Sequence, residues 1–322
     1  MKPPRQQASP AKVPSTLRPA HPTVRASRRL ALPRREVFWG YAFISPWIIG
    51  LLAFTAGPIL AVFYWSFTDY PILSAPSWVG MKNYQRLFLQ DEKFLICIVN
   101  TLIYVGARVP LHLTIAFVVA LLLNRTVRGI GIFRTACYVP SMVPIVAMAV
   151  IWRILLDPRI GYVNYFTGLV GLPPVNWLTS EALVKPVIIF ISLFHVGIPM
   201  IVFLAALGNV PDQLYEAASI DGATAGQQLR HVTIPMVTPA ILYNTVIDVI
   251  NSFQVFAYAF VMTKGGPNDA SLFYVLYIYR QAFEFFQMGY ASALSAILFL
   301  IILAFTILLV KYSDRWVHYE RI

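Results

Sequence analysis

Polar side chains recur at helical spacing inside a long apolar segment near residue 250. Asp248, Asn251 and Ser252 occupy positions i, i+3 and i+4, which places them on one face of a helix. Phe253 and Phe256 flank this polar stripe. A sugar needs hydrogen-bond donors and acceptors for its hydroxyl groups and apolar surfaces for its ring faces. The stripe therefore predicts a binding surface for such a solute.

A second polar pair lies in the preceding apolar segment, where Ser192 and His195 share a helical face. Polar groups are costly in lipid and usually face the interior of a helical bundle. The alternative for Asp248 and Asn251 is hydrogen bonding between helices, which contributes about 0.6 kcal/mol per bond. For His195 the alternative is a core histidine whose ring nitrogens are satisfied. Arg108 also lies deep in an apolar segment and requires a partner that the sequence does not identify.

The sequence lacks the patterns of common catalytic and nucleotide sites. It has no Gly-Lys dipeptide, and therefore no Walker A sequence for ATP. It also has no H-E-x-x-H or G-x-S-x-G pattern. The two cysteines, Cys97 and Cys137, fall in different apolar segments and offer no metal or disulfide pattern. We expect no catalytic residue, no metal and no cofactor bound by this chain.

The composition indicates that these residues belong to a membrane protein. The chain is 58% hydrophobic and 12% charged, whereas a soluble domain carries about 25% charge. Long apolar runs select helices, because a helix satisfies its own backbone in lipid. We expect an all-α integral membrane protein with six transmembrane helices, at residues 37–67, 95–124, 136–156, 185–207, 234–262 and 291–312.

The charge distribution predicts the topology. Residues 1–36 hold nine of the 25 lysine and arginine residues and one of the 14 acidic residues, so the positive excess is mostly one tail and no nucleic acid partner is expected. We expect a disordered basic cytoplasmic tail that touches anionic lipid; an organelle transit peptide is the alternative. The transmembrane domain is 37–312, and 313–322 is a short cytoplasmic tail. Basic residues in both tails and at 125–134 place both termini in the cytoplasm.

A polar stretch at 216–239 lies between two of the apolar segments. Propensity predicts a short helix at 213–220, a turn at Asp221-Gly222, where glycine accepts a positive φ, and a second helical piece at 224–232. Two short helices joined by a glycine turn beside a membrane suit a groove in a partner protein. The alternative is an amphipathic loop lying on lipid headgroups.

This stretch resembles the EAA loop of bacterial ABC importer permeases. In that family pattern a glycine follows the glutamate of E-A-A by six residues, and an I/L-P pair comes about a dozen residues later. Gln228 and the residues around Gly222 are similar to the carbohydrate branch, although Leu229 stands where that branch usually has phenylalanine. The residues that the resemblance assigns to ATPase coupling are Glu216, Ala217, Ala218, Asp221, Gly222, Ile234 and Pro235.

Further motifs resemble carbohydrate permeases of the first type in a permease pair. Two extracytoplasmic loops and two helix ends carry them, and together the matches span about residues 38 to 312. The matching residues are Trp78, Gly80, Asn83 and Tyr84 in the first loop, Gly161 and Asn164 in the second, the T-x-G-G-P sequence at 263–267, and the small residues at 288–293.

The resemblance implies a type I ABC importer permease in the bacterial inner membrane, with a cytoplasmic coupling helix in the loop at 209–235 between helices 4 and 5. It implies four kinds of partner: a second homologous permease, two ATPase subunits that hold ATP and Mg, an extracytoplasmic sugar-binding protein, and membrane lipid. The implied cargo is an oligosaccharide or disaccharide. Its contacts would come from the helices on either side of the loop, with Ser192, His195, Asp248, Asn251, Ser252, Phe253 and Phe256 as candidates.

Two alternatives remain open. A related importer for glycerol phosphate or a polyol derivative shares this permease type, but a phosphate would want arginine or lysine, and the two polar stripes contain neither. A secondary transporter driven by an ion gradient would require intramembrane carboxylates and inverted repeats. Only Asp248 meets the first condition, and no repeat is evident.

Overall fold

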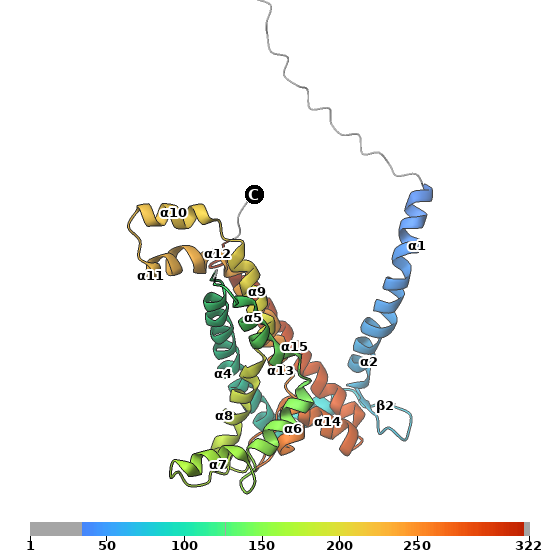
Figure 1. Cartoon of the computed structure of the whole chain (residues 1–322). Helices are drawn as coiled ribbons and strands as arrows, with labels where there is room; N and C mark the ends of the chain where they lie inside the picture. Colours follow the sequence, from blue (N-terminus) through green and yellow to red (C-terminus); the bar gives the residue numbers. More distant parts are fainter. Residues whose placement is uncertain (1–33, 126, 319–322) are drawn as a thin grey trace, which may run out of the picture. The chain divides into compact units, whose positions relative to one another are not determined.

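The computed structural model describes residues 34–125 and 127–318, drawn in Figure 1. Most of the predicted basic tail at 1–36 therefore lies outside the described residues. The chain divides into two compact units, Met1–Thr55 and Ala56–Ile322.

The described part of the first unit is helical. It consists of α1 (Arg34–Leu51) and most of the π-helical turn η1 (Leu52–Ala56). Large apolar side chains such as Phe43, Trp47 and Phe54 are exposed along it. A helix that is apolar on all sides is compatible with a lipid environment.

The second unit is built mainly of helices, with one two-stranded antiparallel sheet. Its α-helices and strands, in chain order, are α2 (Gly57–Trp65), β1 (Thr68–Asp69), β2 (Ser77–Trp78), α3 (Lys82–Leu89), α4 (Glu92–Leu123), α5 (Ile130–Tyr138), α6 (Ile145–Leu155), α7 (Tyr162–Leu169), α8 (Glu181–Ser192), α9 (Gly197–Gly208), α10 (Asp212–Ile220), α11 (Ala225–Gln228), α12 (Ile234–Met236), α13 (Thr238–Phe253), α14 (Tyr274–Tyr279) and α15 (Met288–Ser313). Short 3-10 or π segments are η2 (Val139–Met142), η3 (Leu193–His195), η4 (Leu229–Thr233), η5 (Ala259–Thr263) and η6 (Arg280–Glu284).

The described residues contain three helical runs that are long and apolar enough to cross a membrane: Phe38–Trp65, Glu92–Leu123 and Met288–Ser313. Three bent pairs meet the same test as pairs: Ile130–Met142 with Ile145–Leu155, Glu181–His195 with Gly197–Gly208, and Ala225–Met236 with Thr238–Phe253. Counting each bent pair as one span gives six, which agrees with the predicted all-α membrane fold.

Several predicted spans are interrupted. The segment at 136–156 bends by 91° between η2 and α6, where Pro140 and Pro144 disrupt the helical backbone. The expected helix at 234–262 stops after α13 and resumes at 257. The prediction of one continuous helix is therefore wrong here. The expected loop at 157–184 contains α7.

The turn before α7 is organised by Asp157. Its Oδ1 accepts the backbone N–H groups of Arg159 and Ile160 at 2.9 and 3.1 Å. These two bonds favour the carboxylate and hold the pKa of Asp157 below its ordinary value.

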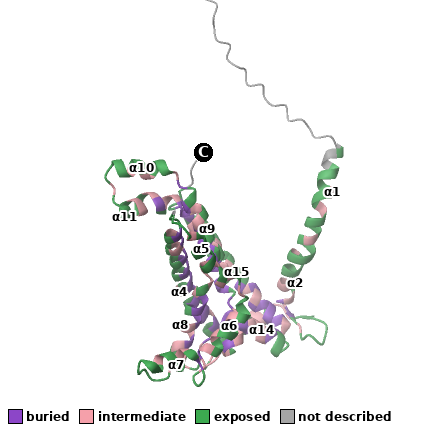
Figure 2. Cartoon of the chain, viewed as in Figure 1, coloured by how far each residue is buried: buried purple, intermediate pink, exposed green. Residues whose placement is uncertain are grey.

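Helix α4 is the centre of the second unit, and Figure 2 shows buried residues along it. It packs against α8, α9 and α13. Ala116 and Ala120, both fully buried, share one core cluster with Met200 and Phe203 of α9. Small residues let two helices approach closely in a membrane bundle. A larger core cluster joins α4 to α8, α13 and α14.

The loop after η5 ties the helix ends together at the end of the unit that holds α7 (Figure 1). Asn100 of α4 donates to the carbonyl oxygen of Asp269 at 2.9 Å and accepts from Nζ of Lys185 of α8 at 3.0 Å. Nζ of Lys93 lies 3.0 Å from a carboxylate oxygen of Asp269. These bonds join α4, α8 and the loop.

We expect Gly289→Ala to destabilise the second unit by about 1–3 kcal/mol, because a new methyl group overpacks this site. A Cβ at Gly289 would lie 2.0 Å from the carbonyl oxygen of Thr68 in β1. Thermal unfolding of the purified protein in detergent measures the effect. Gly168→Ala in α7 is the matched control, because nothing lies within 4 Å of its Cβ position. Equal unfolding midpoints for the two variants would contradict the prediction.

Candidate functional site

A cavity of about 500 Å³ lies between α4, α9, α13 and the break that follows α13. Apolar side chains such as Ile198 and Val202 form part of its wall. Its volume is within the range of sites that hold small organic ligands. The polar and aromatic residues that line it are Tyr104, Arg108, His112, Ser192, His195, Tyr243, Asn244, Asp248, Asn251, Gln254, Phe256 and Tyr258.

Most of the predicted pathway residues meet at this wall: Ser192, His195, Asp248, Asn251 and Phe256. Two predicted residues lie behind it. Ser252 is 1% exposed and accepts a hydrogen bond from Arg108. Phe253 is also buried and packs against Phe305 of α15, with ring centroids 5.1 Å apart. The helical face that lines the cavity is therefore centred on Asp248 and Asn251.

A buried ion pair joins α4 to α13 beside the cavity. Nη1 of Arg108 lies 2.6 Å from Oδ1 of Asp248 and 2.7 Å from Oγ of Ser252. Nδ1 of His112 lies 3.1 Å from Oδ2 of Asp248. All four residues are buried. A carboxylate can only accept, so Nδ1 of His112 carries the proton in this contact.

This network identifies the partner that Arg108 required. It also adds Tyr104, Arg108 and His112 to the cavity wall, none of which we predicted as pathway residues. The signal was present, because the three polar side chains occur every four residues in an apolar segment and so share a helical face. Within the described residues, Nε2 of His112 has no hydrogen-bond partner.

His195 is half-buried and contacts groups on two sides. Its Nδ1 lies 3.2 Å from the hydroxyl of Tyr258, and its Nε2 lies 3.5 Å from the carbonyl oxygen of Val143. The hydroxyl of Ser192 donates to the carbonyl oxygen of Ile189 at 2.6 Å. Both predicted residues line the cavity, but much of their hydrogen-bonding capacity is used inside the protein.

Asn251 and Gln254 are different, because both side chains are exposed at the cavity wall. Neither amide forms a hydrogen bond with the described residues. An amide offers two donor hydrogens and one acceptor oxygen. These two groups are therefore available to a ligand with hydroxyl groups.

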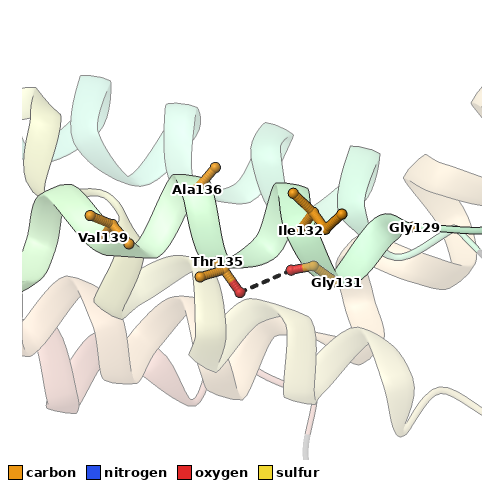
Figure 3. A pocket seen from close by; sticks show the side chains of 6 residues that line it. All are labelled: Gly129, Gly131, Ile132, Thr135, Ala136 and Val139. Atoms are coloured by element: carbon orange, nitrogen blue, oxygen red, sulfur yellow. Dashed lines mark hydrogen bonds between the residues drawn. The ribbon is translucent and has the colours of Figure 1, made fainter.

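A second hollow lies on the outer face of α5, shown in Figure 3. Its side chains are mostly apolar and include Ile132 and Val139. The hydroxyl of Thr135 is already bonded to the carbonyl oxygen of Gly131 at 3.0 Å. This surface offers little to a polar solute.

The two predicted short helices joined by a turn are present as α10 and α11. Helix α10 ends with the backbone N–H of Ala223 bonded to Ala218 O and that of Gly222 bonded to Ser219 O, the pattern of a Schellman cap. Gly222 has a φ of +77°. Thr224 and Gln227 form a capping box at the start of α11. The turn that joins the two helices is therefore fixed at both sides.

Two side-chain bridges hold these helices and η4 together. Nε2 of Gln228 donates to Oγ of Ser219 at 2.9 Å, and the hydroxyls of Tyr215 and Thr233 lie 2.9 Å apart. We call α10, α11 and η4 the hairpin. Ile220, at the end of α10, is 87% exposed, so part of the apolar face of α10 is uncovered.

The structure places the predicted coupling residues along this hairpin and at its base. Glu216, Ala217 and Asp221 are exposed, Ala218 is half-buried in α10, and Ile234 and Pro235 begin α12. Helix α9 leads from the cavity to α10, and α12 and α13 lead from the hairpin back to the cavity (Figure 1). Both ends of the hairpin are thus connected to the cavity.

We expect Arg108→Met to destabilise the protein by about 3–5 kcal/mol, because it leaves the charge of Asp248 buried without its cation. The double variant Arg108→Met with Asp248→Leu should recover most of that loss. Thermal or denaturant unfolding in detergent measures both. Arg153→Met is the control, because Arg153 is exposed and, among the described residues, its side chain donates only to the carbonyl oxygen of Val261. Equal losses in the single and double variants would show that the ion pair is not the cause.

Comparisons with known proteins identify the family of the chain. A family model described as "Binding-protein-dependent transport system inner membrane component" matches residues 112–319. The chain is 40% identical over 291 residues to the probable ABC transporter permease protein YesP of Bacillus subtilis (strain 168), covering 89% of this chain and 94% of that protein. It is 28% identical to the arabinooligosaccharides transport system permease protein AraP of the same strain, covering 92% and 96%.

A solved structure has the same fold. It is the crystal structure of a bacterial ABC transporter involved in the import of the acidic polysaccharide alginate, with a TM-score of 0.78 and 26% identity over 87% of this chain and 96% of that chain. The family match covers well over half of the present chain. This chain belongs to the inner-membrane permease components of binding-protein-dependent ABC transport systems.

Proposed function

We propose that this chain is one of two permease subunits of an ATP-driven importer for oligosaccharides or disaccharides. The observation that carries the proposal is a cavity with polar groups in its wall, connected through α9 and α13 to an exposed hairpin. Several relatives support the cargo class, since their names specify arabinooligosaccharides, trehalose/maltose and lactose.

The cavity favours an uncharged sugar. The two polar stripes contain no arginine or lysine, whereas the folded chain brings Arg108 to the cavity wall. Its charge is matched by Asp248 at 2.6 Å. The exposed amides of Asn251 and Gln254 then supply neutral donors and acceptors. A phosphate would find no unmatched lysine or arginine among the described cavity residues.

The charge distribution supports a cytoplasmic location for the hairpin. Arg230 lies in η4 of the hairpin, Lys311 lies in the last turn of α15, and Arg134 donates to the carbonyl oxygen of Leu123 at the end of α4. At the opposite end Lys93 is paired with Asp269. Cytoplasmic segments carry the excess of lysine and arginine, which would also place both termini on that side.

In the proposed cycle, two ATPase subunits bind ATP and Mg, and one of them receives α10 in a surface groove. Glu216 and the apolar side chain of Ile220 are exposed for that contact. Motion of the ATPases would pass through α9 and α13 to the cavity. A second homologous permease would complete the pathway, and an extracytoplasmic binding protein would deliver the sugar.

Purification of the chain from native membranes in mild detergent tests the assembly. We expect a second six-span permease and two ATP-hydrolysing subunits to copurify, with ATPase activity that rises when the binding protein carries sugar. Isolation of the chain alone, or as a homo-oligomer without ATPase activity, would count against the proposal.

Gly222→Val tests the coupling role of the hairpin. A non-glycine residue in the left-handed region costs about 1–2 kcal/mol, so the turn after α10 should change while the membrane spans remain folded. We expect normal insertion but about a tenfold loss of uptake, because a docking free energy weakened by about 1.4 kcal/mol lowers binding tenfold. Gly222→Asn is the control, because asparagine tolerates a positive φ. Equal uptake by the two variants would contradict the role of this turn.

A further inference from the structure

Four aromatic side chains form a continuous series that begins at the cavity. Phe256 and Phe260 are stacked, with ring centroids 5.0 Å apart. Tyr279 lies 5.3 Å from Phe256 and 5.1 Å from Phe260, and Phe283 lies 5.2 Å from Tyr279. We call these four rings the aromatic track.

The two ends of the track have different environments. Phe256 lines the cavity, where the exposed amides of Asn251 and Gln254 also lie. Phe283, in η6, is 55% exposed. The intermediate rings, Phe260 and Tyr279, are half-buried. The track therefore connects the cavity to the surface of the unit.

We propose that the aromatic track binds successive sugar rings and guides an oligosaccharide from this surface into the cavity. The proposal rests on the sugar-importer function proposed above and adds a site outside the cavity. It also specifies the cargo: a saccharide of more than two rings, long enough to contact Phe283 while another ring is at Phe256.

The chemistry of both partners fits. One face of a pyranose or furanose ring presents C–H groups, which pack on the negative face of an aromatic ring. The hydroxyl groups at the edge of the sugar need polar partners. The ring of Tyr279 contacts the other three rings of the track, and its hydroxyl has no hydrogen-bond partner among the described residues. Asn251 and Gln254 offer such partners at its inner end.

The segment that carries the outer rings is held in place. Arg280, next to Tyr279, donates to the carbonyl oxygen of Lys264 and lies 3.8 Å from carboxylate oxygens of Asp269 and Glu284. A positioned aromatic surface binds more tightly than a mobile one, because less conformational freedom is lost on binding.

Two other roles predict different results. If the rings only pack against the core, their removal should destabilise the protein and lower the uptake of every cargo equally. If Phe283 instead contacts the binding protein, its removal should weaken that contact whatever sugar is carried. Dependence on the length of the sugar distinguishes the track from both.

The test begins by choosing a probe for the complete importer. Uptake of radiolabelled maltose, maltotriose, maltotetraose, lactose, arabinobiose, arabinotriose and an alginate trisaccharide is compared between cells with and without this chain. The probe is the longest sugar whose uptake is lost. If the deletion affects none of them, both the proposed function and this inference are contradicted.

The complete importer is then reconstituted in proteoliposomes with wild-type, Phe283→Ala or Phe285→Ala chain. Phe285 is the matched control, since it is 57% exposed and two residues from Phe283, and it has no ring contact within the described residues. We expect Phe283→Ala to raise the KM for the probe about fivefold, as expected for one lost ring contact, and to leave the maximal rate within about twofold of wild type. Phe283→Trp should restore the KM.

The outcomes are distinct. A larger rise in KM on Phe283→Ala for a three-ring sugar than for a two-ring sugar of the same series supports the track. If only sugars of three or more rings are taken up, a rise in KM with Phe283→Ala and not with Phe285→Ala supports it. Equal effects of Phe283→Ala and Phe285→Ala contradict it while leaving the importer function intact. An effect that is independent of sugar length and is reversed by more binding protein also contradicts it, because that result assigns Phe283 to the protein interface.

Discussion

The contact between Arg108 and Asp248 is the constraint on which the second unit depends. A charge buried in a membrane bundle is tolerated only when it is paired, so α4 and α13 must remain in register at this point. His112 and Ser252 complete the arrangement by binding the remaining carboxylate oxygen and the guanidinium group. Asp248 and Asn251 share one helical face. The ion pair between Arg108 and Asp248 therefore also determines which side of α13 faces the cavity.

The cavity and the hairpin are separate sites joined by two helices. Helix α9 lines the cavity with Ile198 and Val202 and leads into α10, while α13 returns from the hairpin with Asn251 near its far end. The hairpin is rigid for its size, because a Schellman cap, a capping box and two side-chain bridges fix its shape. A rigid element at the end of two packed helices can transmit displacement without first deforming.

The sequence identified the helices and the hairpin because their signals are local. Apolar run length predicts a span, and Asp221-Gly222 predicts a turn, without knowledge of distant residues. The partner of Arg108 could not be predicted, because Asp248 is 140 residues away along the chain. The same limit explains why Ser252 was expected at the cavity wall. Helical periodicity gives the face that a residue occupies, but only packing decides whether an arginine from another helix covers it. The break after α13 carries no proline or glycine and was therefore not expected.

That break has a mechanical consequence. Gln254, Val255 and Phe256 separate α13 from the segment that continues into η5, and a helix already interrupted at one point bends there more readily than elsewhere. Beyond the break, the loop around Asp269 is fastened to α4 and α8. The chain from the hairpin to this loop therefore has two points at which its helix is interrupted, at Val237 between α12 and α13 and at residues 254–256. The wall of the cavity at Gln254–Phe256 thus has an interrupted backbone that can bend, whereas the loop beyond it is held by bonds to two other helices.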